Sequence, residues 1–341
     1  MQLGTTVSYA GNVRETIERV RTFEKAGLDV AWVAEAYGYD AVTMMGYLAA
    51  RTERVQIGSG ILPLYSRSPA LLAQTAAGLD HLSDGRALLG LGASGPQVVE
   101  GWHGAVYDRP LERTREIIEI CRRVWRREVL RNEGIYPIPL PSGQGTGLGK
   151  PLKIINCPIR PSIPIFVAAL GAKNVQLAAE VADGWLPTMF VPEYVDQIWG
   201  EALRRGLAAR AEELSPLRIA AGGPLAIGED VTDLRNRLRA ELALYIGGMG
   251  ARKRNFYFNI AAKLGHEGAA ARIQDLYLAG LKDEAAAAVP AELLEGMSLI
   301  GPRGYVKERL AAYRQAGVTI LNVHPIGPDP VGDLERLRSW L

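Results

Sequence analysis

The segment "GLGASGPQVVEGWHG", Gly90 to Gly104, decides between two folds for this chain. Its first six residues match Gly-x-Gly-x-x-Gly, the dinucleotide-binding fingerprint of a Rossmann fold. That fold also requires a first strand before the fingerprint and a helix that opens at the third glycine. It further requires an acidic residue about 20 positions later, at the end of a second strand.

The residues around the fingerprint do not meet these requirements. Three strand–helix units precede it, so the fingerprint follows the fourth predicted strand rather than the first. Pro96 follows Gly95 directly, and the next strong helical pattern begins only at Pro110. The acidic residues near the expected offset, Glu112 and Glu116, fall inside that helix. The Rossmann interpretation therefore fails.

The whole chain alternates between short apolar runs and segments of helical period. In 13–27, for example, Ile17, Val20 and Phe23 recur at helical spacing, and Gly27 is a natural stop. Nearly continuous apolar strands between helices indicate a parallel sheet covered on both faces. Eight units predict an α/β protein with a (β/α)8 TIM barrel; a doubly wound open sheet is the alternative. The predicted strands are 3–9, 30–36, 55–62, 86–92, 163–170, 183–188, 217–227 and 318–325.

Two segments interrupt the alternation within a single barrel domain, 1–341. Residues 131–161 are rich in Pro and Gly and have no helical period, which predicts an insertion with room for a hairpin. Residues 230–299 are helical in pattern but too long for one crossover, so 245–290 is expected to be a helical insertion.

Composition excludes several classes of protein. With 341 residues, 48% of them hydrophobic, the chain can bury a large core. A net charge of +2 with mixed signs gives no footprint for nucleic acid. Two cysteines without a CxxC or a His/Cys cluster predict no metal site and a reduced, cytoplasmic setting. No signal peptide and no apolar run of about 18 residues is present, so no membrane association is expected.

In a barrel, function lies at the carboxyl ends of the strands. Glu35 leaves the second strand and is a candidate acid or base, since a dry pocket would raise its pKa. It could equally be a rim residue or the partner of a loop arginine. Gly58 and Gly60 within the third strand indicate a bulge, the close approach of a ligand, or barrel packing. Arg67 precedes a helix start, where it could bind an anion or simply be solvated.

The fourth and fifth strands lead into further polar candidates. Ser94 and Gly95 can offer backbone amides and a hydroxyl to a polar ligand. Glu100 and His103 follow near the same mouth, although a histidine beside a tryptophan is more often structural. Gly171 opens a helix whose first amides would favour a phosphate, and ordinary loop chemistry also predicts a glycine there. The residues alone indicate a barrel enzyme with a phosphate-bearing ligand.

Three segments also carry a family resemblance: "WVAEAYGYDAV" (32–42), the long stretch 54–104, and "VAALGAKNVQLAAEVADGWLPT" (167–188). They resemble the luciferase-like monooxygenase superfamily. Within it, they are most similar to the coenzyme F420-dependent oxidoreductases related to methylenetetrahydromethanopterin reductase. The most specific part is Ser94–Gln97 with Glu100–Trp102. The resemblance runs over residues 1 to about 230 and again over 298–327, and it implies a barrel with insertions that forms a homodimer.

The resemblance assigns cofactor-binding roles by position. The end of the third strand would form a bulge that backs the deazaflavin ring, with a non-proline cis peptide at Gly60–Ile61. The residues after the fourth strand would lie along the cofactor, and those after the fifth would hold its phosphate region. Together with Arg67 as an anion ligand, the expected cofactor-binding residues are Ser59, Gly60, Ile61, Ser94, Gly95, Leu170, Gly171 and Ala172.

Departures from the family pattern bear on the substrate. Members that act on sugar phosphates carry Asp-His at the end of the second strand, where this chain has Glu35-Ala36. After the sixth strand it has the apolar set 187–190. A small apolar or conjugated substrate is therefore expected. The implied reaction is hydride transfer between the deazaflavin C5 and an activated C=C, C=N or alcohol/carbonyl group, with Glu35, Glu100 or His103 handling the proton.

Two rival functions follow from the same resemblance. An FMN-dependent monooxygenase of the superfamily would use oxygen, with which a deazaflavin hardly reacts. A non-catalytic flavin- or deazaflavin-binding protein would hold the cofactor without turnover. The basic cluster Arg252-Lys253-Arg254 could meet the polyglutamate tail of the cofactor or could be a solvated helix face.

Overall fold

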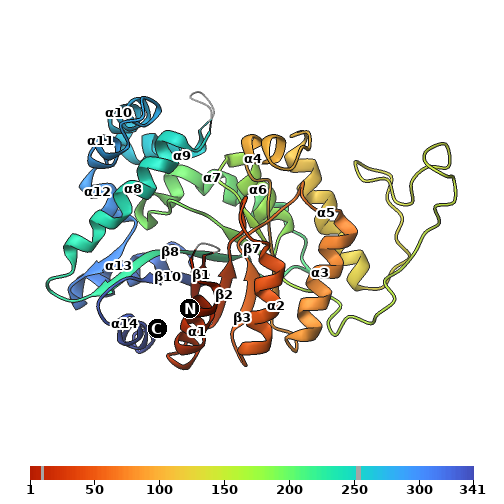
Figure 1. The fold of residues 1–341 in the computed structure, drawn as a ribbon, viewed down its shortest axis with the longest axis horizontal. Helices are drawn as coiled ribbons and strands as arrows, with labels where there is room; N and C mark the ends of the chain where they lie inside the picture. The colour runs from red at the N-terminus through yellow and green to blue at the C-terminus, as the bar shows by residue number, and fades with distance from the viewer. Residues whose placement is uncertain (9–10, 251–254) are drawn as a thin grey trace.

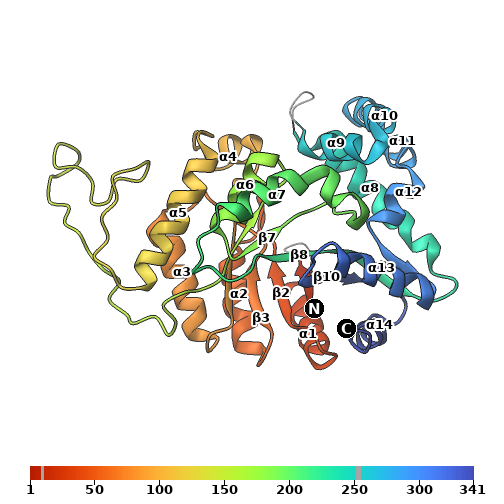
Figure 2. The same ribbon diagram turned by 180° about the vertical axis from the view of Figure 1, so that it is seen from behind.

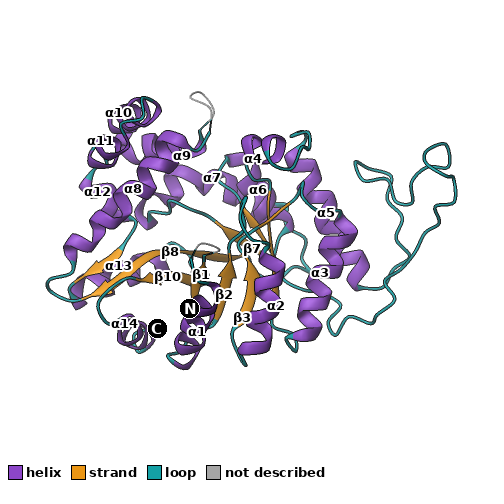
Figure 3. Ribbon diagram, in the orientation of Figure 1, coloured by secondary structure: helices purple, strands orange, loops and turns teal. Residues whose placement is uncertain are grey.

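The computed structural model describes residues 1–8, 11–250 and 255–341. Its parallel strands close into a barrel in the order β1-β2-β3-β5-β6-β7-β8-β10, because β10 pairs with both β8 and β1. Figure 3 shows these strands at the centre with helices around them. The predicted (β/α)8 barrel is confirmed, and the open sheet is excluded. The strands are β1 (Gln2–Val7), β2 (Val30–Val33), β3 (Gln56–Ser59), β4 (Leu62–Pro63), β5 (Ala87–Gly92), β6 (Ile165–Ala168), β7 (Gly184–Leu186), β8 (Arg218–Ile227), β9 (Leu299–Gly301) and β10 (Ile320–Pro325).

Helices follow the strands and cover the outside of the barrel (Figure 1). Their starts follow capping chemistry: Ser68 accepts a hydrogen bond from the Leu71 amide, with Pro69 in the first turn of α3. The barrel helices are α1 (Val13–Lys25), α2 (Ala41–Arg51), α3 (Pro69–Leu82), α4 (Pro96–Gly101), α5 (Pro110–Trp125), α6 (Ala172–Val181), α7 (Glu201–Ala208), α13 (Arg303–Gln315) and α14 (Pro330–Arg338). Between β8 and β9 lie α8 (Leu238–Ala243), α9 (Phe256–Ala261), α10 (Glu267–Leu278), α11 (Lys282–Ala287) and α12 (Ala291–Gly296). Short 3₁₀ or π segments are η1 (Pro192–Tyr194), η2 (Asp196–Gly200), η3 (Thr232–Arg237), η4 (Leu244–Gly248) and η5 (Ala262–His266).

One helix differs from the sequence expectation. α4 begins at Pro96, directly after Gly95, where no helix was predicted. Proline fits the first turn of a helix because its missing N–H has no partner there in any case. The helix has six residues, of which only Val99 is buried, so it is too short to show an apolar period. The Rossmann interpretation still fails, because the strands close into a barrel.

The barrel interior is filled below its mouth. Trp32 and Phe166 meet edge to face with ring centroids 4.9 Å apart, and Trp32 Nε1 donates a hydrogen bond of 3.0 Å to Asn322 Oδ1. Gly58 makes room for this packing, since a Cβ there would lie 2.5 Å from the Trp32 ring. A ligand can therefore enter only at the mouth. The inner cluster consists of Val30, Trp32, Leu88, Phe166, Ala220 and Ile320.

The predicted strand 55–62 is divided by a bulge. Gly58 pairs with Leu88, and Leu62 pairs with Leu91. Three residues, 59–61, therefore oppose two, 89–90, which is the pattern of a β-bulge. The Gly60–Ile61 peptide within it is cis, as the resemblance implies.

The two long connections have different structures. Residues 131–161 project from the barrel beside α5 as a long loop, as both views show (Figures 1 and 2). An antiparallel bridge joins Asn132 to Ile138 near its base. The described part of 245–290 is helical and packs with α8. Arg252, Lys253 and Arg254 lie outside the described residues. In the described part of the chain, no helix is long and apolar enough to cross a membrane.

Candidate functional site

A flat apolar floor lies at the mouth of the barrel, above the Trp32 layer. Ile61 at the bulge lies against Gly92 of β5: a Cβ on Gly92 would meet Ile61 Cγ1 at 2.9 Å. The same Cβ would lie 3.5 Å from Cβ of Ala168 on β6. Ile61 and Ala168 are both partly exposed. Three neighbouring strand ends thus bring partly exposed apolar side chains together around a glycine, which leaves room for a ring to lie close to the backbone.

The start of α6 borders this floor with unsatisfied backbone donors. Gly171 is the N-cap and offers no side-chain oxygen, while the first amides of a helix have no intrahelical acceptors. The loop before the helix is fixed from behind, since Trp185 Nε1 donates to the Ala169 carbonyl at 2.9 Å and Trp199 Nε1 to the Leu170 carbonyl at 2.8 Å. With the dipole adding positive character, this helix start can hold a phosphate.

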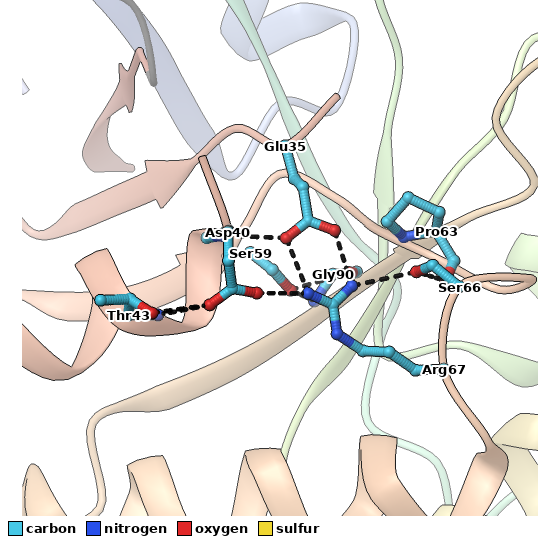
Figure 4. Close-up of polar contacts among 9 residues, drawn as sticks. Glu35, Asp40, Thr43, Ser59, Pro63, Ser66, Arg67 and Gly90 are labelled. Atoms are coloured by element: carbon cyan, nitrogen blue, oxygen red, sulfur yellow. Dashed lines mark hydrogen bonds and ion pairs between the residues drawn. The ribbon is translucent and has the colours of Figure 1, made fainter. Parts of the chain in front are cut away.

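Glu35, Arg67 and Asp40 form an ion-pair cluster beside the floor (Figure 4). Arg67 Nη1 donates to Glu35 Oε1 at 2.6 Å, and Nη2 donates to Glu35 Oε2 at 2.8 Å. Nη2 also donates to Asp40 Oδ1 at 2.6 Å. Glu35 Oε2 accepts a further hydrogen bond from the amide of Ala41 at 2.8 Å. The other Asp40 oxygen caps α2 by accepting from the amide and hydroxyl of Thr43.

Electrostatics keeps Arg67 and Asp40 of this cluster charged. Burial alone would lower the pKa of Arg67, but its hydrogen bonds to Glu35 and Asp40 raise it above the ordinary value. Burial alone would raise the pKa of Asp40, but donation by Thr43 and Arg67 lowers it. The pairing disfavours Glu35 as a proton donor and Arg67 as an anion ligand. Of the alternatives for Glu35, the structure shows the partner of a loop arginine.

The remaining predicted cofactor residues lie at the same mouth. Ser59 is fully buried, and its hydroxyl both donates to the Gly90 carbonyl at 2.8 Å and accepts from the Gly90 amide at 2.9 Å. It therefore ties the bulge to β5 rather than facing a ligand. Ser94 is exposed and has a left-handed backbone, with φ of 57°, where β5 turns into α4. Gly95 caps α4 without a side chain.

Comparison with known proteins assigns the family. The family model of the luciferase-like monooxygenases matches residues 1–319. The chain belongs to this family. It is 40% identical, over 99% of both chains, to a Mycobacterium tuberculosis protein named "Putative coenzyme F420-dependent oxidoreductase". It also shares the fold of the coenzyme F420-dependent tetrahydromethanopterin reductase from Methanopyrus kandleri, with a TM-score of 0.80 and 21% identity, covering 98% of this chain and 96% of that one. A solved F420-dependent secondary alcohol dehydrogenase gives a TM-score of 0.76 at 17% identity, covering 100% and 98%.

These matches confirm the resemblance stated from the sequence, and the luciferase-like chain is an enzyme of this family.

The other two proton-donor candidates, Glu100 and His103, are not part of the Arg67 cluster. Glu100 is exposed on α4, and its Oε1 accepts from the Tyr107 amide at 3.4 Å. His103 follows α4 and is half-buried, and its Nε2 has no hydrogen-bond partner among the described residues. Both remain candidates.

In the set 187–190, Pro187 and Thr188 are at least partly exposed, but Met189 and Phe190 do not line the mouth as the sequence suggested. Met189 and Phe190 are 3% and 2% exposed, and the Phe190 ring stacks on Trp199 and Tyr313 in the core. The residue types after a strand show whether the segment is apolar, but not whether its side chains point toward the mouth or into the core. Sequence reasoning also missed Asp40, although an Asp directly before a helical pattern is a common N-cap.

The apolar surface at the mouth comes instead from exposed aromatic rings. The rings of Tyr37 and Trp102 lie 6.3 Å apart at 51° to each other and are 66% and 64% exposed. Tyr39, in the same loop as Tyr37, is also exposed. A tyrosine-rich loop directly after a predicted strand was the available signal for this surface.

Proposed function

We propose that this luciferase-like enzyme is an F420-dependent oxidoreductase that transfers a hydride between the deazaflavin and a small apolar or conjugated substrate. The observation that carries the proposal is the adjacency of the Ile61–Gly92–Ala168 floor to the start of α6, which has no side-chain cap and has the Phe256 ring beside Gly171. A deazaflavin cofactor needs a flat apolar support for its ring system and donors for its phosphate, and these two features supply both. The full-length relative from Mycobacterium tuberculosis supports the choice of cofactor.

The residues present fit such a cofactor without rearrangement of the strand ends. Ile61 and Ala168 would support the ring, Ser94 would lie along it, and the amides of Ala172 and Lys173 would face the phosphate. When bound, F420 supplies or accepts a hydride at its C5. The protein's own tasks are to fix the ring against the floor, to exclude water and to hold a proton near the reacting carbon.

Glu100 and His103 are the better candidates for handling that proton. Glu35 accepts three hydrogen bonds within the Arg67 cluster, whereas Glu100 is exposed. His103 Nε2 is buried without a partner among the described residues, so the imidazole would have to turn before it could reach a substrate. An acid that acts on a substrate must have a free proton position directed toward it. His103 is flanked by the mouth residue Trp102, which places it near any substrate held there.

The test measures oxidation of reduced F420 by cyclohex-2-enone without oxygen, and separately oxidation by air. We expect enone-dependent turnover that oxygen neither replaces nor accelerates. Turnover that requires oxygen, and that FMN supports better than F420, would establish the monooxygenase alternative. Tight F420 binding without any turnover over a panel of enones, imines and alcohols would favour the non-catalytic alternative.

The same assay identifies the proton donor. Glu100→Gln and His103→Gln are compared with Glu35→Gln, each matched in size to the native side chain. Loss of one general acid lowers the rate about 10²- to 10⁴-fold, and we expect this for Glu100 or His103 while cofactor affinity is retained. If only Glu35→Gln produced such a loss, the assignment made here would be wrong.

A further inference from the structure

One guanidinium fixes both ends of the loop that follows β2. Arg67 is bonded to Glu35, where the loop begins, and to Asp40, which caps α2 where the loop ends. The four residues between them, 36–39, include the exposed rings of Tyr37 and Tyr39. Since Arg67 is 12% exposed in its side chain and held by two carboxylates, it gives this short loop a defined position.

Tyr37 makes its ring contact with a residue from a different strand end. Trp102 follows α4, which comes after β5, and the two ring centroids are 6.3 Å apart. In the barrel, β3 lies between β2 and β5. The Tyr37–Trp102 pair therefore spans the end of β3, where the bulge brings Ile61 to the mouth.

The charges beside the pair disfavour an anionic occupant. Glu35 and Asp40 share the single guanidinium of Arg67, so the cluster has a formal net charge of −1, and Glu100 is exposed two residues before Trp102. A carboxylate at this position opposes an anionic ligand. The two exposed rings contact each other at an angle of 51° and so present an angled aromatic surface, against which a flat ring can pack by its face or its edge.

We propose that Tyr37 and Trp102 form an aromatic slot that binds the planar, conjugated part of a substrate without negative charge, and that Arg67 is the positioning residue that holds Tyr37 in this slot. The inference rests on the proposed function, whose hydride-transfer site would lie on the Ile61 floor below. It adds the substrate class and the residues that recognise it.

The test compares two ketones that differ only in the ring: acetophenone, which is planar, and cyclohexyl methyl ketone, which is puckered. Their dissociation constants are measured by calorimetry on the full-length protein, with and without F420. Stacking on both rings predicts that acetophenone binds about tenfold more tightly. Tyr37→Ala and Trp102→Ala should each reduce this preference to about threefold or less, while Tyr37→Phe should preserve it.

The matched control is Tyr47→Ala, which removes an exposed tyrosine from α2 and should preserve the preference. Arg67→Lys retains the charge but lacks the fork that spans two carboxylates, so it should behave like Tyr37→Ala while F420 affinity changes by less than about twofold. An unchanged preference in both Tyr37→Ala and Trp102→Ala overturns the slot. An unchanged preference in Arg67→Lys overturns the positioning role. Absence of F420 binding with an intact ketone preference overturns only the proposed function.

Discussion

The Arg67 guanidinium holds the Glu35 carboxylate by two hydrogen bonds, from Nη1 to Oε1 at 2.6 Å and from Nη2 to Oε2 at 2.8 Å. The Glu35 side chain is 7% exposed, so the pair is largely out of water. The two residues come from different strand ends, after β2 and after β4, and their pairing joins the two loops at the mouth. A carboxylate used in this way orders the site rather than reacting in it.

Removing one member of this pair should lower the free energy of unfolding more than removing both. Arg67→Met leaves the Glu35 carboxylate buried without its partner, and we expect a loss of about 3–5 kcal/mol in the free energy of unfolding. The double variant Glu35→Gln/Arg67→Met no longer buries that charge and should recover part of the loss. Urea unfolding of the wild type, both single variants and the double variant measures the coupling. Additive losses would show that the two side chains act independently.

The Asp40 contribution to stability should disappear in acid. Hydrogen bonds from Thr43 and Arg67 lower the pKa of Asp40 in the folded state below its ordinary value of 3.8. The unfolded state therefore binds the proton first. The stability that Asp40 contributes is complete above about pH 3.8 and is lost as the pH falls through the lower pKa of the folded state.

Asp40→Asn isolates this effect, because asparagine does not titrate. Below pH 4, the unfolding free energy of the wild type should fall more steeply than that of Asp40→Asn, so that their difference shrinks. Parallel curves for the two proteins over this range would contradict the assignment.

Two glycine-to-alanine substitutions should change the stability of the protein in opposite directions. At Gly90 a Cβ would lie 1.8 Å from the Ser59 carbonyl oxygen, so Gly90→Ala should displace the bulge and destabilise by about 3 kcal/mol or more. At Gly78, an exposed position within α3, a Cβ meets nothing within 4 Å. There alanine should stabilise by about 0.5–1 kcal/mol because it restricts the unfolded chain. Thermal unfolding midpoints that move in the same direction would refute this contrast.

The two cysteines should differ sharply in reactivity. Cys121 is fully buried, and burial raises the pKa of its thiol to about 12, whereas Cys157 is exposed. Thiolates rather than thiols react with disulfide reagents. Titration with such a reagent at pH 8 should therefore give one rapidly reacting thiol per native chain and two after denaturation. Rapid reaction of both thiols in the native protein would show that α5 opens readily.

The barrel could be predicted because its strands and helices have distinct apolar periods, each visible within about ten residues. The glycines of the third strand indicated a bulge as one of three alternatives, and only the family resemblance placed a cis peptide at Gly60–Ile61. The ion pair could not be predicted from spacing, since Arg67 lies 32 residues after Glu35 and the fold alone brings them together. The sequence likewise showed Phe190 to be apolar without showing that it points into the core.

The central claim is that the uncapped start of α6 holds the phosphate of a deazaflavin whose ring lies on the Ile61 floor. Ala172 is exposed in the first turn of α6, so its side chain can be changed without disturbing the core. An aspartate there suits the helix dipole and should preserve stability, but its charge opposes a bound phosphate. Ala172→Asn is the neutral control of the same shape.

The decisive measurement is a fluorescence titration of the wild type, Ala172→Asp and Ala172→Asn with F420 and, separately, with FMN. We predict that the wild type binds F420 more tightly than FMN. Ala172→Asp should weaken F420 binding about tenfold or more, whereas Ala172→Asn should change the F420 affinity less than about twofold. Preference for FMN, or equal F420 affinity in all three proteins, would contradict the account.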